Sequence, residues 1–325
     1  MNSFSNIGIE PGRAICYSGY RKGQRPGHTI PCYEEVKEDL LLLEGYWKYL
    51  RLYNCDDHSQ TVLDVIEKEN LDFKVMLGAY IEAEMNNFNC PWGGGVYSEE
   101  ELELNASQNK EKIQKLAGFA DKYSDVIFSL SVGNEACVDW TDHYVHEDKV
   151  LEYVNMLKST AVQPVTFCEN YVPWLHKLEI LAEALDFICV HTYPVWEYKH
   201  INEAIDYTKE NYYSVAEKYP DSPVVIAEAG WATKSNGNGI NPAHVSESYQ
   251  KIYFEHLMKW TDEEGILTFF FEAFDEDWKG SSEPLEPEKH WGLFYIDRTP
   301  KMAIRSMYSK KLVGTSTDKK EHILS

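Results

Sequence analysis

Two glutamates stand at the ends of two apolar, strand-like segments of the sequence. Glu228 follows the β-branched run VVIA of residues 224–227, and Glu135 ends the segment DVIFSLSVGNE of residues 125–135. Apolar runs of this kind are typical of strands that are buried on both faces of a parallel sheet. A carboxylate at the end of such a strand needs a charged partner or a chemical role, because burying it alone is costly.

The sequence between Glu135 and Glu228 spans about three strand–helix units. In a barrel, that spacing places them at the carboxyl ends of the fourth and seventh strands, facing each other. Two facing carboxylates can hydrolyse a glycosidic bond, since one donates a proton to the leaving oxygen while the other, ionised, attacks or activates water. The alternative is that each glutamate caps a helix or pairs with a lysine at the rim.

Short apolar segments alternate with longer amphipathic segments along the chain. The apolar segments, which favour strands, are 13–20, 49–54, 72–81, 125–135, 163–170, 186–194, 223–231 and 265–276. The amphipathic segments, which favour helices, are 36–46, 60–70, 108–123, 147–159, 176–185, 202–219, 243–260 and one that begins near Thr299. Eight such units predict an α/β protein with a (β/α)8 TIM-barrel fold. An open doubly wound sheet is the alternative, but no glycine-rich phosphate fingerprint follows the first strand.

The connecting segments predict which end of the barrel carries the site. Helix-to-strand links are short, whereas strand-to-helix links are long, notably 82–107 and 277–298. Barrel enzymes place their active sites on the face that these long loops form. We therefore expect one catalytic domain over 1–311, with long βα loops around a substrate cleft, and a flexible C-terminal tail over 312–325.

The composition argues against several kinds of partner. A net charge of −22 disfavours nucleic acids and anionic membrane surfaces, which are themselves polyanionic. No apolar run approaches the ~18 residues that a transmembrane helix needs. The seven cysteines form no C-x-x-C pair and no metal-ligand spacing is present, so we expect neither a metal nor another cofactor.

The N-terminal segment has no apolar stretch typical of a secretory signal. Together with the unpaired pattern of the cysteines, this predicts a cytoplasmic protein, or a periplasmic or secreted one if the chain is a processed form. We expect a monomer. A cytoplasmic enzyme would meet imported oligosaccharides rather than large glucans.

Five motifs together resemble glycoside hydrolase family 17, the β-1,3-glucanase family of clan A, and most closely its bacterial members. They are SVGNEA (131–136), HTYP (191–194), VVIAEAGW (224–231), FFFEAFDEDWK (269–279) and EKHWGLFYID (288–297). The resemblance runs from about Arg13 to Met307. It implies a retaining mechanism, with Glu135 as general acid/base, Glu228 as nucleophile and their carboxyl groups ~5–5.5 Å apart.

The resemblance also implies roles for neighbouring residues. Asn134 is expected to contact the sugar 2-hydroxyl, and Tyr193 to hydrogen-bond the nucleophile unless it is a core tyrosine. His191 faces the same side as Tyr193 if the strand is regular. Three further positions match the family and border the site: Glu276, Lys279 and Glu288. A salt bridge at the rim is the alternative for Glu288.

Aromatic residues near the strand ends are candidates for sugar contacts. Tyr17 and Tyr53, at the ends of the first two strands, are placed to line the floor of the site. Three tryptophans could offer flat faces to pyranose rings: Trp231, Trp278 and Trp291. The loop 82–107 is expected to form a wall.

Two loops depart from the plant-type pattern of the family. They are EAGWATKSNGNG (228–239) and CVDWTDHYVHED (137–148), the second of which adds Trp140 and His143. They leave open how many sugar units fit on each side of the site.

These observations predict a retaining hydrolase of β-1,3-glucosidic bonds in laminarin-type β-glucan or its oligosaccharides. A β-1,3-glucosyltransferase is the nearest alternative, because it would use the same two carboxylates with a sugar as acceptor. A non-catalytic glucan-binding barrel is the more distant one.

Overall fold

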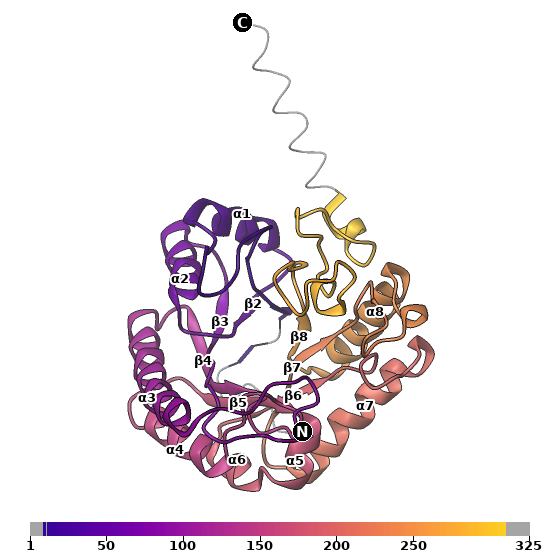
Figure 1. Ribbon diagram of the computed structural model, residues 1–325. Coiled ribbons are helices and arrows are strands. Elements are labelled where there is room, and N and C mark those ends of the chain that lie inside the picture. The colour runs from indigo at the N-terminus through magenta and orange to yellow at the C-terminus, as the bar shows by residue number, and fades with distance from the viewer. Residues whose placement is uncertain (1–8, 11, 310–325) are drawn as a thin grey trace, which may run out of the picture.

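A computed structural model describes residues 9–10 and 12–309, and it contains a closed barrel of eight parallel strands (Figure 1). The strands are β1 (Ala14–Cys16), β2 (Tyr49–Leu52), β3 (Lys74–Ala79), β4 (Ile127–Asn134), β5 (Val165–Asn170), β6 (Ile188–Thr192), β7 (Val224–Gly230) and β8 (Thr268–Phe271). The predicted TIM barrel is confirmed. An open sheet is excluded because β1 pairs with β8, with Ala14 opposite Phe269.

Helices connect successive strands and surround the barrel (Figure 1). They are α1 (Tyr33–Leu43), α2 (Asp57–Glu69), α3 (Glu99–Lys122), α4 (Glu147–Lys158), α5 (Tyr171–His176), α6 (Glu179–Ala184), α7 (Ile201–Lys218) and α8 (Glu247–Glu264), with short 3-10 turns at Pro242–His244 and Pro287–Lys289. Every residue of β7 is buried, because one face of the strand meets the barrel interior and the other meets the helices.

Several element boundaries differ from the sequence prediction. Helix α3 begins at Glu99, well before the predicted 108, because Ser98 caps it and its first turn is acidic rather than apolar. The predicted helix 176–185 is two short helices, α5 and α6. Beyond Thr299, helical residues begin at 305, and the predicted tail, 312–325, lies outside the described residues.

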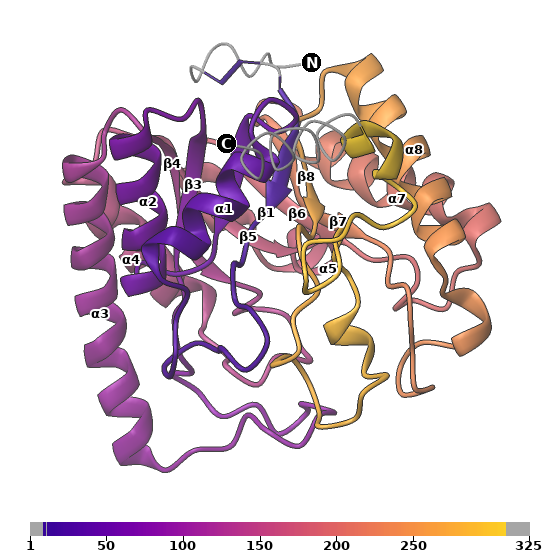
Figure 2. The ribbon, with the colours of Figure 1, turned by 90° about the horizontal axis from the view of Figure 1, so that it is seen from above.

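The long strand-to-helix loops gather at one end of the barrel, the lower end in Figure 2. The longest of them lead from β3 to α3 and from β8 to the C-terminal segment. The carboxyl ends of the strands lie at this same end. The end at which the sequence predicted the site therefore also carries the longest irregular segments. In the part of the chain that the structure describes, no helix is both long and apolar enough to span a bilayer.

Two buried ion pairs attach the C-terminal segment to the barrel. Arg298 binds both carboxylate oxygens of Asp39 on α1, each at 2.7 Å. The fully buried Lys301 donates to Asp275, after β8, at 2.7 Å and to Thr233, after β7, at 2.9 Å. A buried charge that loses its partner is strongly destabilising, so these contacts fix the segment in place.

Replacing Lys301 with alanine is expected to lower the free energy of unfolding by about 3–5 kcal/mol, because Asp275 is left buried without its cation. Urea unfolding followed by both circular dichroism and fluorescence measures the change. Lys259→Ala is the control, since Lys259 and Glu263 are 74% and 65% exposed and such surface pairs contribute at most about 1 kcal/mol. Equal losses in the two variants would contradict the prediction.

Candidate active site

The two predicted catalytic glutamates lie at strand ends whose regular pairing is interrupted. The pairing of β4 with β5 shifts between Ser131 and Asn134, and Gly133 there has φ +79°. A Cβ at Gly133 would lie 3.0 Å from the Ile81 side chain, so both space and conformation favour glycine. Glu135 follows with φ +47°, a left-handed conformation that is uncommon outside glycine. Such irregularities redirect side chains near active sites.

Glu228 is buried and surrounded by hydrogen-bond donors. Its carboxylate accepts hydrogen bonds from Arg51, from the Tyr53 hydroxyl at 2.9 Å and from the Tyr193 hydroxyl. Burial would raise the pKa of Glu228, but the charges of His191 and Arg51 and the two tyrosine hydrogen bonds lower it to about 2. Glu228 is therefore an ionised carboxylate, although only 5% of its surface is exposed.

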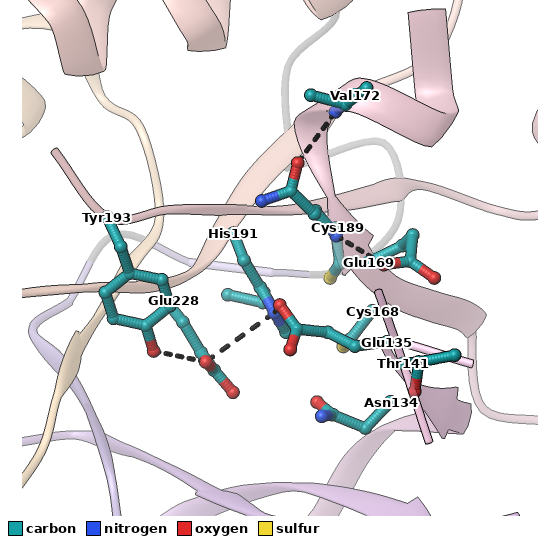
Figure 3. Close-up of polar contacts among 12 residues, drawn as sticks. Asn134, Glu135, Thr141, Cys168, Glu169, Val172, Cys189, His191, Tyr193 and Glu228 are labelled. Carbon is teal, nitrogen blue, oxygen red and sulfur yellow. Dashed lines mark hydrogen bonds and ion pairs between the residues drawn. The ribbon is translucent and has the colours of Figure 1, made fainter. Parts of the chain in front are cut away.

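His191 lies between the two predicted catalytic glutamates, Glu135 and Glu228 (Figure 3). Its Nδ1 is 2.9 Å from Oε1 of Glu135 and 3.6 Å from Oε2 of Glu228, and its ring is fully buried. Burial lowers the pKa of His191, but the charge of Glu228 and the hydrogen bond to Glu135 raise it to about 10. The imidazolium form therefore holds both carboxylates in one cluster.

Arg51 is the main site residue that the sequence reasoning missed. It lies on β2, across the barrel from β7, and it also donates to the Asn134 side chain at 2.5 Å and to the Ala227 carbonyl at 3.2 Å. It therefore connects Glu228 with the residue before Glu135. The available signal was a lone charge inside an otherwise apolar strand, YLRL.

Asn134 is held from a second direction by His143, which the sequence marked as an extra residue of the β4–α4 loop. Nε2 of His143 contacts the main-chain oxygen of Asn134 at 2.8 Å. Its Nδ1 contacts Asp142 at 2.8 Å and the Tyr80 hydroxyl at 2.9 Å. His143 thus fixes the backbone from which Glu135 projects.

A second charged cluster lies after β8, where Lys279 is shared by two buried glutamates. Its Nζ is 2.7 Å from both Glu272 and Glu276. Glu276 also accepts from Ser18 at 2.5 Å and from the partly exposed Trp278 at 2.8 Å. Burial raises the pKa of Glu272, a residue that the sequence reasoning did not single out, well above its ordinary value. Glu276, Lys279 and Trp278 thus lie together, as expected of a charged border.

The charges of Glu135 and Glu228 also affect the pKa values of two further carboxyls, Glu288 and Glu169. Burial and the charges of Glu228 and Glu135 raise the pKa of Glu288 to about 7, although Lys279 opposes the shift. Glu288 makes no ion pair within the described residues, so a rim salt bridge does not account for it there. Glu169 on β5 is fully buried and accepts from the backbone N–H groups of Cys137 and Asn170. Burial and the charge of Glu135 raise its pKa to about 8.

The structure corrects two of the aromatic predictions and limits a third. Tyr17 is 1% exposed and donates to Asp39 at 3.3 Å, so it belongs to the core rather than to the floor of the site. Trp231 is fully buried against Tyr253 of α8, so its ring faces the helix layer and offers no face to a sugar. Trp291 is the third: it is only 1% exposed, and its ring centroid lies 5.1 Å from that of Tyr193, so little of its face is open to a sugar. Strand position alone could not show which way these side chains turn.

Comparisons with known proteins extend over most of the chain. The BtgE/BtgC glycoside hydrolase domain family matches residues 14–292. A glucan 1,3-beta-glucosidase of Arthroderma benhamiae is 23% identical over 308 residues, which cover 89% of this chain and 90% of that protein. A probable glucan endo-1,3-beta-glucosidase, btgC, of Aspergillus clavatus is 24% identical over 299 residues. That match covers 85% of this chain but only 40% of the Aspergillus protein.

Two solved structures share the barrel. An endo-laminarinase from Formosa Hel1_33_131 superposes with a TM-score of 0.79 at 28% identity, covering 92% of this chain and 87% of that one. An active-site mutant of the Rhizomucor miehei β-1,3-glucanosyltransferase, in complex with laminaritriose, superposes with a TM-score of 0.70 at 19% identity. The shared regions are 90% of this chain and 96% of that one, and at this identity the likeness concerns the fold alone.

The contact between His191 and Glu228 predicts that the two groups titrate together. Glu228→Gln removes the charge that raises the pKa of His191, so that pKa is expected to fall by at least about one unit. Titration of 15N-labelled imidazoles by NMR measures the shift. His58, a buried histidine that accepts the Gly19 N–H at 3.1 Å, serves as internal control and should titrate as before. An unchanged pKa of His191 would show that the two groups are not coupled.

Proposed function

We propose that this chain, which belongs to the family of BtgE/BtgC glycoside hydrolase domains, hydrolyses β-1,3-glucosidic bonds with retention of anomeric configuration. Family membership makes the chain a glycoside hydrolase. The observation that carries the proposal is the placement of His191 Nδ1 against both Glu135 and Glu228. Nδ1 is 2.9 Å from Oε1 of Glu135 and 3.6 Å from Oε2 of Glu228. The separation of these two oxygens therefore cannot exceed the sum of the two distances. This favours the short spacing of retaining enzymes over the ~6.5–9.5 Å of inverting ones.

Glu228 is suited to be the nucleophile. A nucleophilic carboxylate must be ionised at the start of the reaction, and the surrounding donors hold the pKa of Glu228 at about 2. Arg51 and Tyr53 contact Oε1, whereas Tyr193 contacts Oε2, so both oxygens are oriented. The oxygen that attacks the anomeric carbon would exchange one of these hydrogen bonds for a covalent bond to the sugar.

Glu135 is suited to be the acid/base. Its side chain is 29% exposed, against 6% for Glu228, so it can reach a leaving oxygen and later a water molecule. His191 hydrogen-bonds one of its oxygens, and the contact of His143 with the Asn134 carbonyl holds the backbone before it. In the first step Glu135 would donate its proton to the leaving oxygen, and in the second it would take a proton from the attacking water.

The β-1,3-glucan substrate is proposed on two grounds. The relatives that match most of the chain are named as a glucan 1,3-beta-glucosidase and glucan endo-1,3-beta-glucosidases, and the structure with 28% identity is an endo-laminarinase. The five sequence motifs also support membership of glycoside hydrolase family 17, which we propose as the finer assignment. Transfer to a sugar acceptor uses the same covalent intermediate and remains the second candidate. Products longer than the substrate would identify it.

We also propose that the enzyme works in the cytoplasm as a monomer. Five of its seven free cysteines are buried, which suits a reducing compartment. Fractionation of the source cells tests the compartment, and recovery from the periplasm or medium would reject it. Measurement of the native mass in solution tests the oligomeric state, and a dimer mass would reject the monomer.

Removing either carboxylate tests the assignment of roles. Glu228→Ala is expected to abolish turnover of laminari-oligosaccharides, because no covalent intermediate can form. Glu135→Ala is expected to slow the same substrates by about 10²–10⁴-fold, but to spare aryl glycosides whose leaving group needs no proton. Glu263→Ala, which removes an exposed carboxylate, is the control.

The same assay tests the nucleophile and acid/base assignments separately. Ordinary turnover by Glu228→Ala would sink the nucleophile assignment, and equal losses on both substrate types would sink the acid/base assignment. NMR of the first product formed by the wild-type enzyme should show the β-anomer, whereas the α-anomer would reject retention.

A further inference from the structure

The loop between β3 and α3 is fastened to the loop that follows β4. The backbone N–H of Glu84 donates to the Tyr144 carbonyl at 3.0 Å, and the Asn87 side chain donates to the carbonyls of Asp139 and Thr141 at 2.8 and 2.7 Å. Farther along, the Tyr97 hydroxyl donates to the Asp142 carbonyl at 2.8 Å. Because these bonds engage both ends of the loop, it forms a fixed part of the barrel mouth.

The loop is also folded on itself and reaches far across the barrel. The Asn87 N–H donates to the Gly95 carbonyl at 2.6 Å, and Gly95 has φ +80°. A Cβ at Gly95 would meet the Asn87 carbonyl at 2.8 Å, so only glycine suits this close approach. In Figure 1 the loop passes in front of β5 toward β6, although it starts from β3.

The tip of the loop touches an aromatic row that begins at the nucleophile. Trp92 lies edge-on to Trp196, with ring centroids 6.4 Å apart, and Trp196 stacks on Trp291 at 6.3 Å. Trp291 in turn packs against Tyr193, which donates to Glu228. Exposure rises along the row, from 1% at Trp291 to 68% at Trp92. The outer rings thus face solvent while the inner ones are held by the site.

The loop that follows β7 also contacts the ring of Trp196. Gly239, in the segment after β7, has φ +77°, and a Cβ there would lie only 2.2 Å from the ring of Trp196. Any side chain at this position would displace Trp196. The loops after β3, β6 and β7 therefore converge on one tryptophan, at the side of the mouth next to β6.

We propose that Trp92 and Trp196 form a binding site for a sugar ring of a β-1,3-linked oligosaccharide. We propose further that the β3–α3 loop closes this side of the barrel mouth, so that only a short stretch of glucan fits there. The inference rests on the proposed function. Pyranose rings present apolar faces that bind tryptophan, and an indole on a stabilised loop binds with little loss of conformational entropy.

Binding to an inactive enzyme tests the sugar site independently of turnover. In a Glu228→Gln background, Trp92→Ala is expected to weaken the binding of laminarihexaose about three- to tenfold, the size of one aromatic contact. Phe88→Ala is the matched control, because Phe88 lies on the same loop, is 79% exposed and joins no aromatic pair among the described residues. Trp92→Phe should restore much of the loss. Equal affinities of the Trp92→Ala and Phe88→Ala proteins would overturn the proposed site.

Product analysis tests the closure in the active enzyme. For the wild-type enzyme, kcat/KM should increase with chain length from laminaritriose and reach a constant value before laminarihexaose. In the Trp92→Ala variant this increase should be smaller. Replacing residues 89–94 with two glycines should open the mouth and release longer products from polymeric laminarin. An unchanged product pattern would overturn the closure. Failure of the wild-type enzyme to cleave any of these glucans would instead reject the proposed function.

Discussion

The site depends on the burial of one carboxylate among fixed positive charges. Glu228 can be buried and remain ionised only because Arg51, His191 and two tyrosine hydroxyls replace its hydration. His191 on β6 lies opposite Glu228 on the neighbouring β7, but Arg51 comes from β2, so it meets Glu228 only when the barrel has closed. Closure of the barrel therefore supplies one of the two cationic partners that keep Glu228 ionised.

The two predicted catalytic carboxyls, Glu228 and Glu135, differ in burial and in their charged contacts. Arg51 and His191 both contact Glu228, whose side chain is 6% exposed, whereas Glu135, at 29%, has His191 as its one ion-pair partner among the described residues. A pair of carboxyls in unlike environments is the usual basis for dividing acid and nucleophile roles. His191 belongs to both surroundings, because its single Nδ1 contacts each carboxylate. A change in the protonation of one glutamate can therefore affect the other through His191.

Periodicity and strand ends were sufficient to predict the barrel and to place Glu135, Glu228 and Asn134 at its mouth. They were insufficient for Arg51 and Glu169, because contacts inside a barrel join strands that are distant in sequence and no local pattern encodes them. Tyr17 and Trp231 were misplaced for a related reason: β1 ends at Cys16, and the pairing of β7 with β8 shifts between Ile226 and Ala229. Regular alternation therefore no longer predicts where side chains point beyond these positions.

The two segments that depart from the plant-type pattern of the resembling family are both connected to Trp196, one directly and one through the β3–α3 loop. The loop after β7 brings Gly239 against Trp196, and the loop after β4 holds the loop whose Trp92 touches the same ring. None of these contacts involves the charges around Glu228. The barrel strands fix the chemistry through buried ionic contacts, whereas the loops form the outer surface through exposed aromatic ones. Such a division allows the outer surface to change in sequence while Glu228 and its partners stay the same.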